Sequence, residues 1–224
     1  MVIFCSTNKV YGENVNGIEV REDAGRYSFA PEWEAGIPET FSIDRCEHTP
    51  YGCSKLTGDI YAQDFGHLYG LRAGVFRMSC IYGTRQFGLE DQGWVAWFVI
   101  AALAGKPITI FGDGKQVRDV LWIEDLLRAY EAFIRGDFRV EVFNMGGGPR
   151  FTLSLLELLE IIREETGVKP AIAYAGWRPS DQKVYISDTR RAQRILDWTP
   201  AVAPREGVRR LIAWTRENLP RFAL

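Results

Sequence analysis

The sequence has no excess of basic residues and no long apolar run. Its 27 lysine and arginine residues are balanced by 29 aspartate and glutamate residues, which gives a formal net charge of -2. Nucleic-acid-binding domains usually carry a basic excess, so we expect no nucleic-acid partner. No apolar stretch is long enough to cross a membrane, and the opening residues, MVIFCSTNKVYG, lack the basic segment of a signal peptide. We therefore expect a cytoplasmic protein without membrane contact.

The cysteines include no CxxC pair; they are Cys5, Cys46, Cys53 and Cys80. Reduced thiols are therefore expected, and not a disulfide framework. Cys46, His48 and Cys53 stand close together in the sequence, but their spacing matches no zinc-binding pattern. We predict no metal site.

The order of the expected elements predicts an α/β fold. Residues 2–6 and 72–77 have the pattern of buried strands, and a helix over residues 49–70 separates them. A strand, a helix and another strand form the unit of a parallel sheet. The polar stretch 13–47 is expected to be a long loop. Further helices are expected at 94–103, 124–135, 154–165, from 188 and at 204–214, and further strands at 107–111, 117–122, 140–145, 170–174 and 183–187.

Turn and helix-end residues give finer expectations. Thr49 followed by Pro50 is typical of a helix start, and Ser154 with Glu157 fits a capping box. The GDG string at residues 112–114 predicts a hairpin-like turn between two strands. The helix 124–135 is expected to point these apolar residues inward: Leu126, Leu127, Tyr130, Phe133 and Ile134.

Tyr51 and Lys55 form a YxxxK pattern at the start of the predicted helix 49–70. A spacing of four residues places both side chains on one helix face. A lysine ammonium beside a phenol stabilises the phenolate, which makes Tyr51 a candidate proton acceptor from a substrate hydroxyl. A surface pair on an amphipathic helix would give the same pattern, so the pair alone leaves both interpretations open.

The YxxxK pattern belongs to an ordered series of short motifs. STNKVYG at residues 6–12 and IYG at residues 81–83 each follow a predicted strand, and QVRD at 116–119 and RPSD at 178–181 come later. The series resembles the extended short-chain dehydrogenase/reductase family, in particular its NAD-dependent nucleotide-sugar epimerases and dehydratases. The resemblance runs from residue 1 to about residue 215. It implies NAD as the cofactor and a CDP-sugar or another nucleotide sugar as the substrate.

The resemblance also implies roles for individual residues. Thr7, Tyr51 and Lys55 correspond to the catalytic residues, and Ser6, Tyr51 and Lys55 to residues that contact NAD. The arginines of QVRD and RPSD suit a diphosphate because a guanidinium binds phosphate oxygens in bidentate fashion; a solvated surface charge is the alternative for each. The residues implied to bind the substrate are Asn8, Lys9, Cys80, Gln92, Trp94, Gln116, Arg118, Arg178 and Asp181.

Trp94, Trp97 and Phe98 allow two interpretations. Their rings could stack on a nucleobase, or they could belong to a packed, largely apolar helix, which is the more common situation. Cys80 stands where the family commonly has an asparagine, and a thiol forms weaker hydrogen bonds than an amide.

The resemblance implies the C-terminal part of a Rossmann-type parallel sheet together with a smaller α/β substrate-binding domain. We expect residues 1–105 to form a partial NAD-binding domain. Residues 106–224 are expected to form mainly the nucleotide-sugar-binding domain, with segments that could return to the sheet.

The glycine-rich GxxGxxG loop that opens this family, with its βα units, has no counterpart in the sequence. The GDGK string at 112–115 and the three glycines at 146–148 lack the strand–glycine–helix spacing, so we interpret both as turns. We expect the chain alone to bind NAD poorly and to expose one edge of strand 2–6. A homo-oligomer, or a partner chain that carries the missing half, would cover that edge.

The motif details favour epimerisation. Dehydratases of the family carry an Asp-Glu pair after the catalytic threonine, whereas this sequence has Asn8 and Lys9. STNKVYG, DQGW at residues 91–94 and GDGKQVRDVL at 112–121 resemble epimerases that act at C2 of a CDP-linked dideoxyhexose. Two alternatives stay open: a 4-epimerase of another nucleotide sugar, and an inactive fragment or non-catalytic nucleotide-sugar-binding module.

Overall fold

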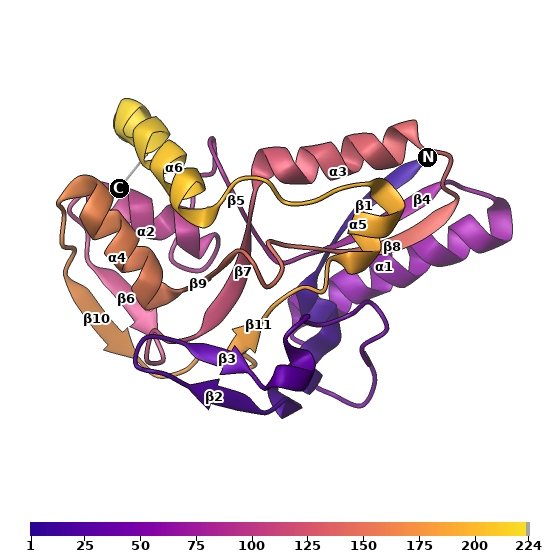
Figure 1. The fold of residues 1–224 in the computed structure, drawn as a ribbon, viewed down its shortest axis with the longest axis horizontal. Helices are drawn as coiled ribbons and strands as arrows, with labels where there is room; N and C mark the ends of the chain where they lie inside the picture. Colours follow the sequence, from indigo (N-terminus) through magenta and orange to yellow (C-terminus); the bar gives the residue numbers. More distant parts are fainter. Residues whose placement is uncertain (223–224) are drawn as a thin grey trace.

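Three parallel strands form a sheet at one end of the molecule, in a computed structural model that describes residues 1–222 (Figure 1). They are β1 (Val2–Thr7), β4 (Ala73–Met78) and β8 (Val140–Met145). The order is β1-β4-β8, and all three strands run in the same direction. The central strand β4 is almost wholly buried, as expected of a parallel strand covered on both faces, whereas β1 is an edge strand.

Helices α1 (Pro50–Tyr69) and α3 (Ile123–Arg135) cover opposite faces of this sheet (Figure 1). On the α3 side, the rings of Phe133 and Phe76 pack edge to face with their centroids 5.9 Å apart. On the α1 side, Gly58 lies so close to the ring of Phe4 that any larger side chain would collide with it. The α/β fold class is therefore confirmed, and β8 shows that the second half of the chain returns a strand to the sheet.

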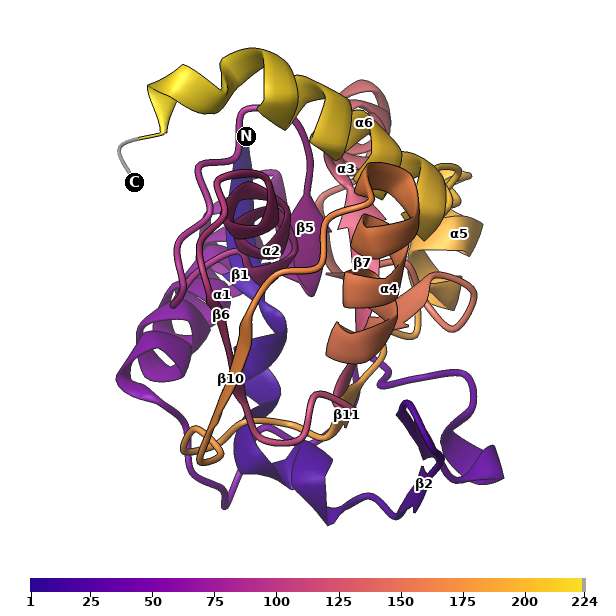
Figure 2. The ribbon, with the colours of Figure 1, turned by 90° about the vertical axis from the view of Figure 1, so that its left-hand side faces the viewer.

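A second group of elements lies beside this sheet (Figure 2). Its helices pack against one another around a closed apolar core, to which Trp122 and Val99 contribute fully buried side chains. Its strands form two small sheets, ordered β10-β6 and β11-β7-β5, with β9 antiparallel to β7. The group comprises β5 (Cys80–Tyr82), α2 (Trp94–Leu103), β6 (Ile108–Phe111), β7 (Val117–Trp122), β9 (Thr152–Ser154), α4 (Leu155–Thr166), β10 (Ile172–Ala175), β11 (Val184–Tyr185) and α6 (Pro204–Asn218).

The predicted helix ends are confirmed where a side chain caps them. Thr49 Oγ1 accepts a hydrogen bond from the backbone N–H of Gly52 at 3.1 Å, and Gly70 ends α1 with a positive φ of 69°. Ser154 and Glu157 form the reciprocal capping box of α4. The helix predicted from residue 188 is α5 (Arg190–Leu196), and the Asp188 carboxylate accepts the backbone N–H of Arg190 at its start, as a capping residue does.

The long-loop prediction for residues 13–47 is partly wrong. The stretch contains the end of a 3-10 segment (Asn8–Gly17), the antiparallel pair β2 (Val20–Glu22) and β3 (Tyr27–Phe29), and a short 3-10 turn (Pro31–Trp33). Tyr27 and Phe29 are buried in an apolar cluster with Tyr185. Burial of these rings stabilises a pair of strands that the polar composition of the stretch concealed.

The hairpin predicted around residues 112–114 is also wrong. The strands before and after the turn lie in different sheets, because β6 pairs with β10 and β7 pairs with β5 and β11. The turn itself exists, with positive φ at Gly112 and Gly114, but it separates the strands. The parallel partners come from distant parts of the chain, so local spacing could not reveal them.

Two residues of α3 do not point inward as predicted. Leu127 and Ile134 are about half exposed, whereas Leu126 and Phe133 are buried. The residues predicted to point inward span too wide an arc of the helix surface. Only the narrower stripe around Leu126 and Phe133 packs against the sheet. Within residues 1–222, no helix combines the length and the apolar character needed to cross a membrane.

Candidate functional site

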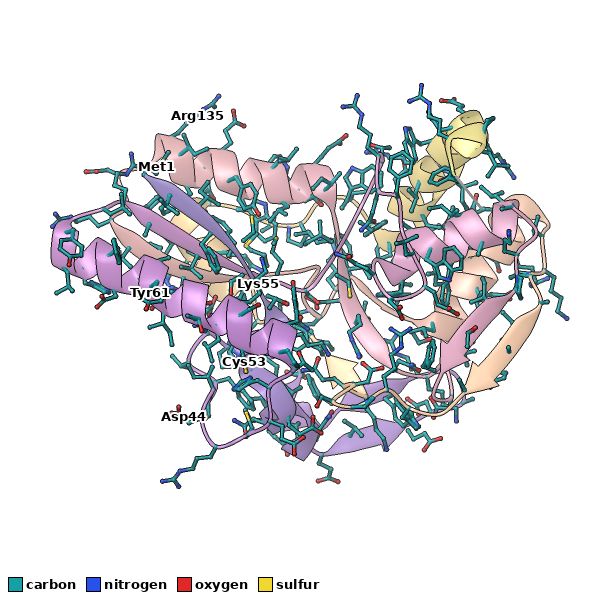
Figure 3. All side chains as sticks on the ribbon, turned by 180° about the vertical axis from the view of Figure 1, so that it is seen from behind. Met1, Asp44, Cys53, Lys55, Tyr61 and Arg135 are labelled. Carbon is teal, nitrogen blue, oxygen red and sulfur yellow. The ribbon has the colours of Figure 1, made fainter. Side chains whose placement is uncertain are left out.

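The carboxyl end of β1 meets the first turns of α1, and this meeting brings the predicted catalytic residues together. Lys55 Nζ donates to the carbonyl oxygen of Cys5 at 3.0 Å and lies 6.0 Å from the centre of the Tyr51 ring. Figure 3 shows Lys55 on the side of α1 that faces the middle of the molecule. Tyr51 is 55% exposed, so its hydroxyl is accessible. Thr7 is buried and its Oγ1 accepts the backbone N–H of Lys9.

A cavity of about 240 Å³ opens in front of these residues. Ser6, Thr7 and Tyr51 line one side of it. Its other side comes from the second group of elements, with Cys80 of β5 and Trp94 of α2. The cavity therefore lies between the parallel sheet and the second group, where a bound molecule would contact both.

An adjoining cavity of about 360 Å³ is lined by every residue that the family resemblance implied to bind the substrate. It shares Cys80, Gln92, Gly93 and Trp94 with the smaller cavity, so the two cavities adjoin along these residues. Phe98, Phe111 and Leu155 add apolar surface. The polar residues of the wall include Asn8, Lys9, Gln116, Arg118, Arg178 and Asp181.

Three cationic side chains converge on this larger cavity. Arg118 is buried and forms an ion pair with Asp181 at 2.6 Å, and Arg178 pairs with Asp91 at 2.8 Å. The guanidinium of Arg178 also lies 3.9 Å from the centre of the Phe111 ring. Each guanidinium has five N–H donors, so both arginines keep donors for a further anion.

Lys9 is the third cation. Its Nζ lies 3.4 Å from the carbonyl oxygen of Ser180. Burial, and then the neighbouring charge of Arg118, lowers the pKa of Lys9 from its ordinary value. An anion bound among the three cations would counteract that shift by compensating their repulsion.

Cys80 and Trp94 touch at the boundary of the two cavities. The indole Nε1 of Trp94 donates to Cys80 Sγ at 3.2 Å. Burial raises the pKa of the Cys80 thiol, so the sulfur is uncharged near neutral pH. Trp97 and Phe98 belong to a packed helix as the alternative interpretation had it, although Phe98 also lines the larger cavity.

A buried polar network that the sequence did not predict lies behind the predicted catalytic residues. Asp59 of α1 is fully buried, accepts the hydroxyl of Ser6 at 2.7 Å and pairs with Arg77 at 2.9 Å. Arg77 also donates to the hydroxyl of Tyr11, which in turn donates to Asn144. Burial raises the pKa of Tyr11 to about 12. The sequence signal for this network is a pair of opposite charges in apolar surroundings: Asp59, one helical turn after Lys55, and Arg77, inside a buried strand.

The cysteine cluster near the start of α1 forms no three-residue site. Cys46 Sγ lies 3.6 Å from His48 Nε2, whereas the thiol of Cys53 faces the backbone carbonyl of His48. In the part of the chain that the structure describes, no three His, Cys, Asp or Glu side chains gather in a way that could hold a metal ion.

Tyr51 is exposed and Lys55 is half-buried, and both present polar groups at the carboxyl end of the parallel sheet, where folds of this kind bind dinucleotides. The glycine turns are occupied by neighbouring side chains. Gly112 packs against the Trp177 ring, and Gly146 against the carboxylate of Asp119. Positive φ angles at Gly112, Gly114 and Gly148 agree with the interpretation of both strings as turns.

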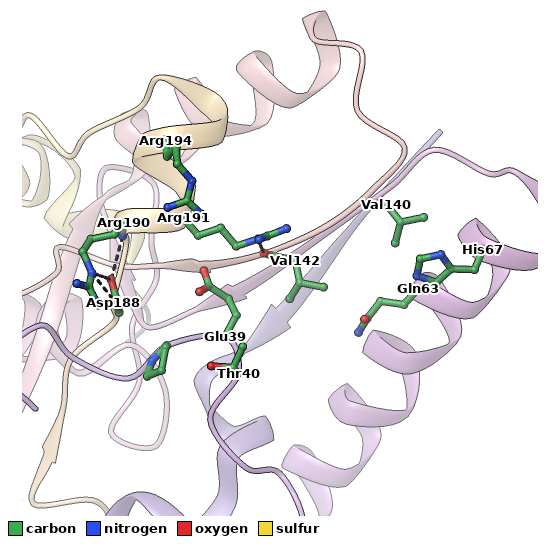
Figure 4. A pocket seen from close by; sticks show the side chains of 11 residues that line it. Glu39, Thr40, Gln63, His67, Val140, Val142, Asp188, Arg190, Arg191 and Arg194 are labelled. Atoms are coloured by element: carbon green, nitrogen blue, oxygen red, sulfur yellow. Dashed lines mark hydrogen bonds and ion pairs between the residues drawn. The ribbon is translucent and has the colours of Figure 1, made fainter.

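A separate cavity of about 510 Å³ lies between α1, β8 and α5 (Figure 4). Two of its three arginines are paired with carboxylates: Arg190 pairs with Asp188, and Arg191 pairs with Glu141. Glu39 adds another acidic side chain to the wall. None of the predicted site residues lines this cavity, and its charges largely compensate one another.

The sequence is similar to those of known proteins. Residues 1–146 match the model of the NAD dependent epimerase/dehydratase family. A CDP-paratose 2-epimerase from Salmonella typhi is 38% identical over 221 residues, which cover 96% of this chain and 64% of that relative. The chain therefore spans less than two thirds of the length of this curated relative.

Solved structures of nucleotide-sugar-binding proteins have a similar fold. A UDP-glucose 4-epimerase from Thermotoga maritima with UDP-glucose is similar with a TM-score of 0.78 and 31% identity, over 97% of this chain and 63% of that one. MoeE5 in complex with UDP-glucose and NAD is similar with a TM-score of 0.79 and 29% identity, over 97% and 65%. The motifs, the parallel sheet and a match over more than half of the sequence agree, and the chain belongs to the NAD dependent epimerase/dehydratase family.

Proposed function

We propose that this protein is an NAD-dependent nucleotide-sugar epimerase that inverts C2 of a CDP-linked dideoxyhexose, converting CDP-paratose to CDP-tyvelose. One observation carries the proposal. Thr7 and Tyr51 line the smaller cavity, and all the residues implied to bind the substrate line the larger cavity that adjoins it. The 38% identity to a CDP-paratose 2-epimerase supports the choice of substrate.

The chemistry follows from the residues around the smaller cavity. Tyr51 accepts the proton of the C2 hydroxyl, and the ammonium of Lys55 stabilises the phenolate. The Thr7 hydroxyl donates to Asn8 Oδ1 at 3.2 Å in the structure, and in the proposal it turns to donate to the same substrate oxygen. NAD bound at Tyr51 and Lys55 supplies a reversible hydride acceptor. Ser6 lies beside this position with its own proton donated to Asp59, so the serine oxygen is left as an acceptor.

The larger cavity holds the nucleotide diphosphate in this proposal. Arg118, Arg178 and Lys9 supply the positive charge, and bidentate guanidinium contacts fix the orientation of the phosphates. Gln116 and Asp181 hold this wall in place, through a hydrogen bond to Phe111 and an ion pair to Arg118. The wall keeps the diphosphate fixed while the keto sugar turns to present its other face.

Two other reactions are less well supported. A 4,6-dehydration needs a carboxylic acid and base beside the sugar, and Asn8 and Lys9 occupy those positions in the cavity. A 4-epimerase of another nucleotide sugar uses the same oxidation at a different carbon, and the likeness to a UDP-glucose 4-epimerase favours it as second candidate. A non-catalytic nucleotide-sugar-binding module would keep the larger cavity without turnover.

The nucleotide preference is tested by calorimetric titration of the chain with CDP-paratose, UDP-glucose and dTDP-glucose. We expect the CDP-sugar to bind at least tenfold more tightly than the others. The reaction is tested by proton NMR with CDP-paratose and NAD, using the protein joined to any segment that carries the glycine loop. Inversion at C4 of UDP-glucose, or a 4-keto-6-deoxy product from CDP-glucose, would replace the proposed reaction.

A further inference from the structure

We propose that Cys80 is a specificity-determining residue, which selects a sugar that carries no hydroxyl on the ring or side-chain carbon lying against its thiol. The inference rests on the proposed function, because it assumes that a nucleotide sugar occupies the two adjoining cavities. It adds the residue that distinguishes a deoxygenated sugar from a fully hydroxylated one.

The position of Cys80 is the first observation. Cys80 lines both cavities, together with Gln92, Gly93 and Trp94. A sugar that reacts at Tyr51 while its diphosphate is held at Arg118 must cross this boundary. Part of the sugar therefore contacts the Cys80 side chain.

The chemistry of the boundary is the second observation. A thiol is a weak donor and a weak acceptor, and the sulfur of Cys80 already accepts the indole N–H of Trp94 at 3.2 Å. The same contact uses the only donor of the indole ring. Gly93 offers no side chain, and Gln92 is exposed at the rim. The surface that Cys80 and Trp94 themselves present to a ligand is thus apolar.

A hydroxyl group pressed against this surface would exchange its bonds to water for contact with sulfur and an aromatic ring. A buried polar group without a strong partner is unfavourable, whereas a methylene or methyl group loses nothing at the same place. The effect has a limit, because an apolar pocket discriminates against an added hydroxyl by only about 10–10²-fold.

The substitution series for the test uses the contacts of Cys80. Cys80→Ser is nearly isosteric and keeps an acceptor for the Trp94 indole, so the local structure is retained. Cys80→Asn introduces strong donors and an acceptor at the boundary. Cys53→Asn is the matched control, because Cys53 is an exposed cysteine of α1 that lines neither cavity.

The experiment is calorimetric titration of each variant with CDP-glucose, CDP-3-deoxyglucose, CDP-6-deoxyglucose and CDP-paratose. We expect the unmodified chain to prefer at least one deoxygenated sugar to CDP-glucose by about tenfold or more. In Cys80→Asn this ratio should fall to within about threefold, and in Cys80→Ser to an intermediate value. Cys53→Asn should keep the original ratio.

The outcomes distinguish a wrong role for Cys80 from a wrong proposed function. If CDP-sugars bind but Cys80→Asn keeps the original ratio, or if the unmodified chain shows no preference, the role of Cys80 is wrong. If Cys80→Asn does not fold, an unchanged ratio in Cys80→Ser contradicts the role equally well. If no CDP-, UDP- or dTDP-sugar binds at all, the proposed function itself is wrong.

Discussion

The parallel sheet and the second group of elements differ in how completely they are covered. Around the second group, α2, α4 and α6 enclose a core whose large side chains, such as Trp122 and Ile100, are fully buried. Around the sheet, the outward side of α1 exposes Ile60, Tyr61, Phe65, Leu68 and Tyr69. Figure 3 shows Tyr61 on that outward side.

The residues that α1 turns inward explain the difference. Its buried positions are Gly52, Asp59 and Gly66, which allow the helix to approach the sheet closely and place one carboxylate there. On the other side of the sheet, Ile3, Leu127 and Ile134 line an open, largely apolar hollow between β1 and α3. Most of the proposed substrate-binding residues thus belong to the second group, whose core is enclosed, and the proposed catalytic residues belong to a sheet whose cover is incomplete.

This comparison assigns chemistry to the sheet and binding to the second group. Tyr51→Phe should therefore lower turnover by about 10²–10⁴-fold, the usual contribution of an acid–base group, while affinity for the nucleotide sugar stays within about threefold. Steady-state rates and calorimetry on the same preparation, with the protein joined to a segment that carries the glycine loop, would show the separation. Near-normal turnover would remove Tyr51 from its proposed role.

The buried Asp59–Arg77 pair should contribute strongly to the stability of the sheet region. Asp59→Asn leaves the Arg77 charge without its partner, so the free energy of unfolding should fall by about 3–5 kcal/mol. Urea denaturation measures the change. Glu160→Gln, which removes the partner of Arg163 in an exposed pair on α4, is the control and should cost less than about 1 kcal/mol. Equal effects of the two variants would contradict the role of burial.

Loss of an arginine from the larger cavity should weaken substrate binding more than it lowers turnover, in contrast to Tyr51→Phe. Arg118→Ala and Arg178→Ala should each weaken CDP-sugar binding by about 1.5–3 kcal/mol, the range for hydrogen bonds to charged groups. The catalytic pair lies outside the larger cavity, so the turnover number at saturating substrate should change much less than the affinity. Unchanged affinity in calorimetry would reject both assignments. Arg163→Ala, on an exposed face of α4, serves as the control.

The smallest effect is expected on the uncovered side of α3. Ile134→Ala removes a half-exposed side chain and should change the free energy of unfolding by less than about 1 kcal/mol, whereas Phe133→Ala on the buried side should cost about 3–5 kcal/mol. Thermal or urea unfolding would compare the two. A large loss for Ile134→Ala would mean that this surface is covered in solution.

The sequence predicted most elements whose signals are local. The Thr49 and Ser154 caps, the apolar strands and the YxxxK pair depend on neighbouring residues, and all of them appear in the structure. The grouping of Asn8, Arg118 and Arg178 in one cavity came from resemblance to a family, since nothing in their spacing brings them together.

Other features depend on distant parts of the chain and stayed hidden. The pairing of β6 with β10 joins residues more than sixty positions apart. The β2–β3 pair requires the rings of Tyr27 and Phe29 to find Tyr185. Asp59 looked like an ordinary polar position of a helix, and only the fold shows Arg77 and Ser6 beside it.

A crystal structure of the chain with a CDP-sugar would locate the substrate. We expect the diphosphate within hydrogen-bond distance of Arg118 and Arg178, and a sugar hydroxyl beside Tyr51, with the sugar crossing the boundary at Cys80 and Trp94. A nucleotide bound in the cavity between α1, β8 and α5, or a diphosphate away from both arginines, would contradict this placement.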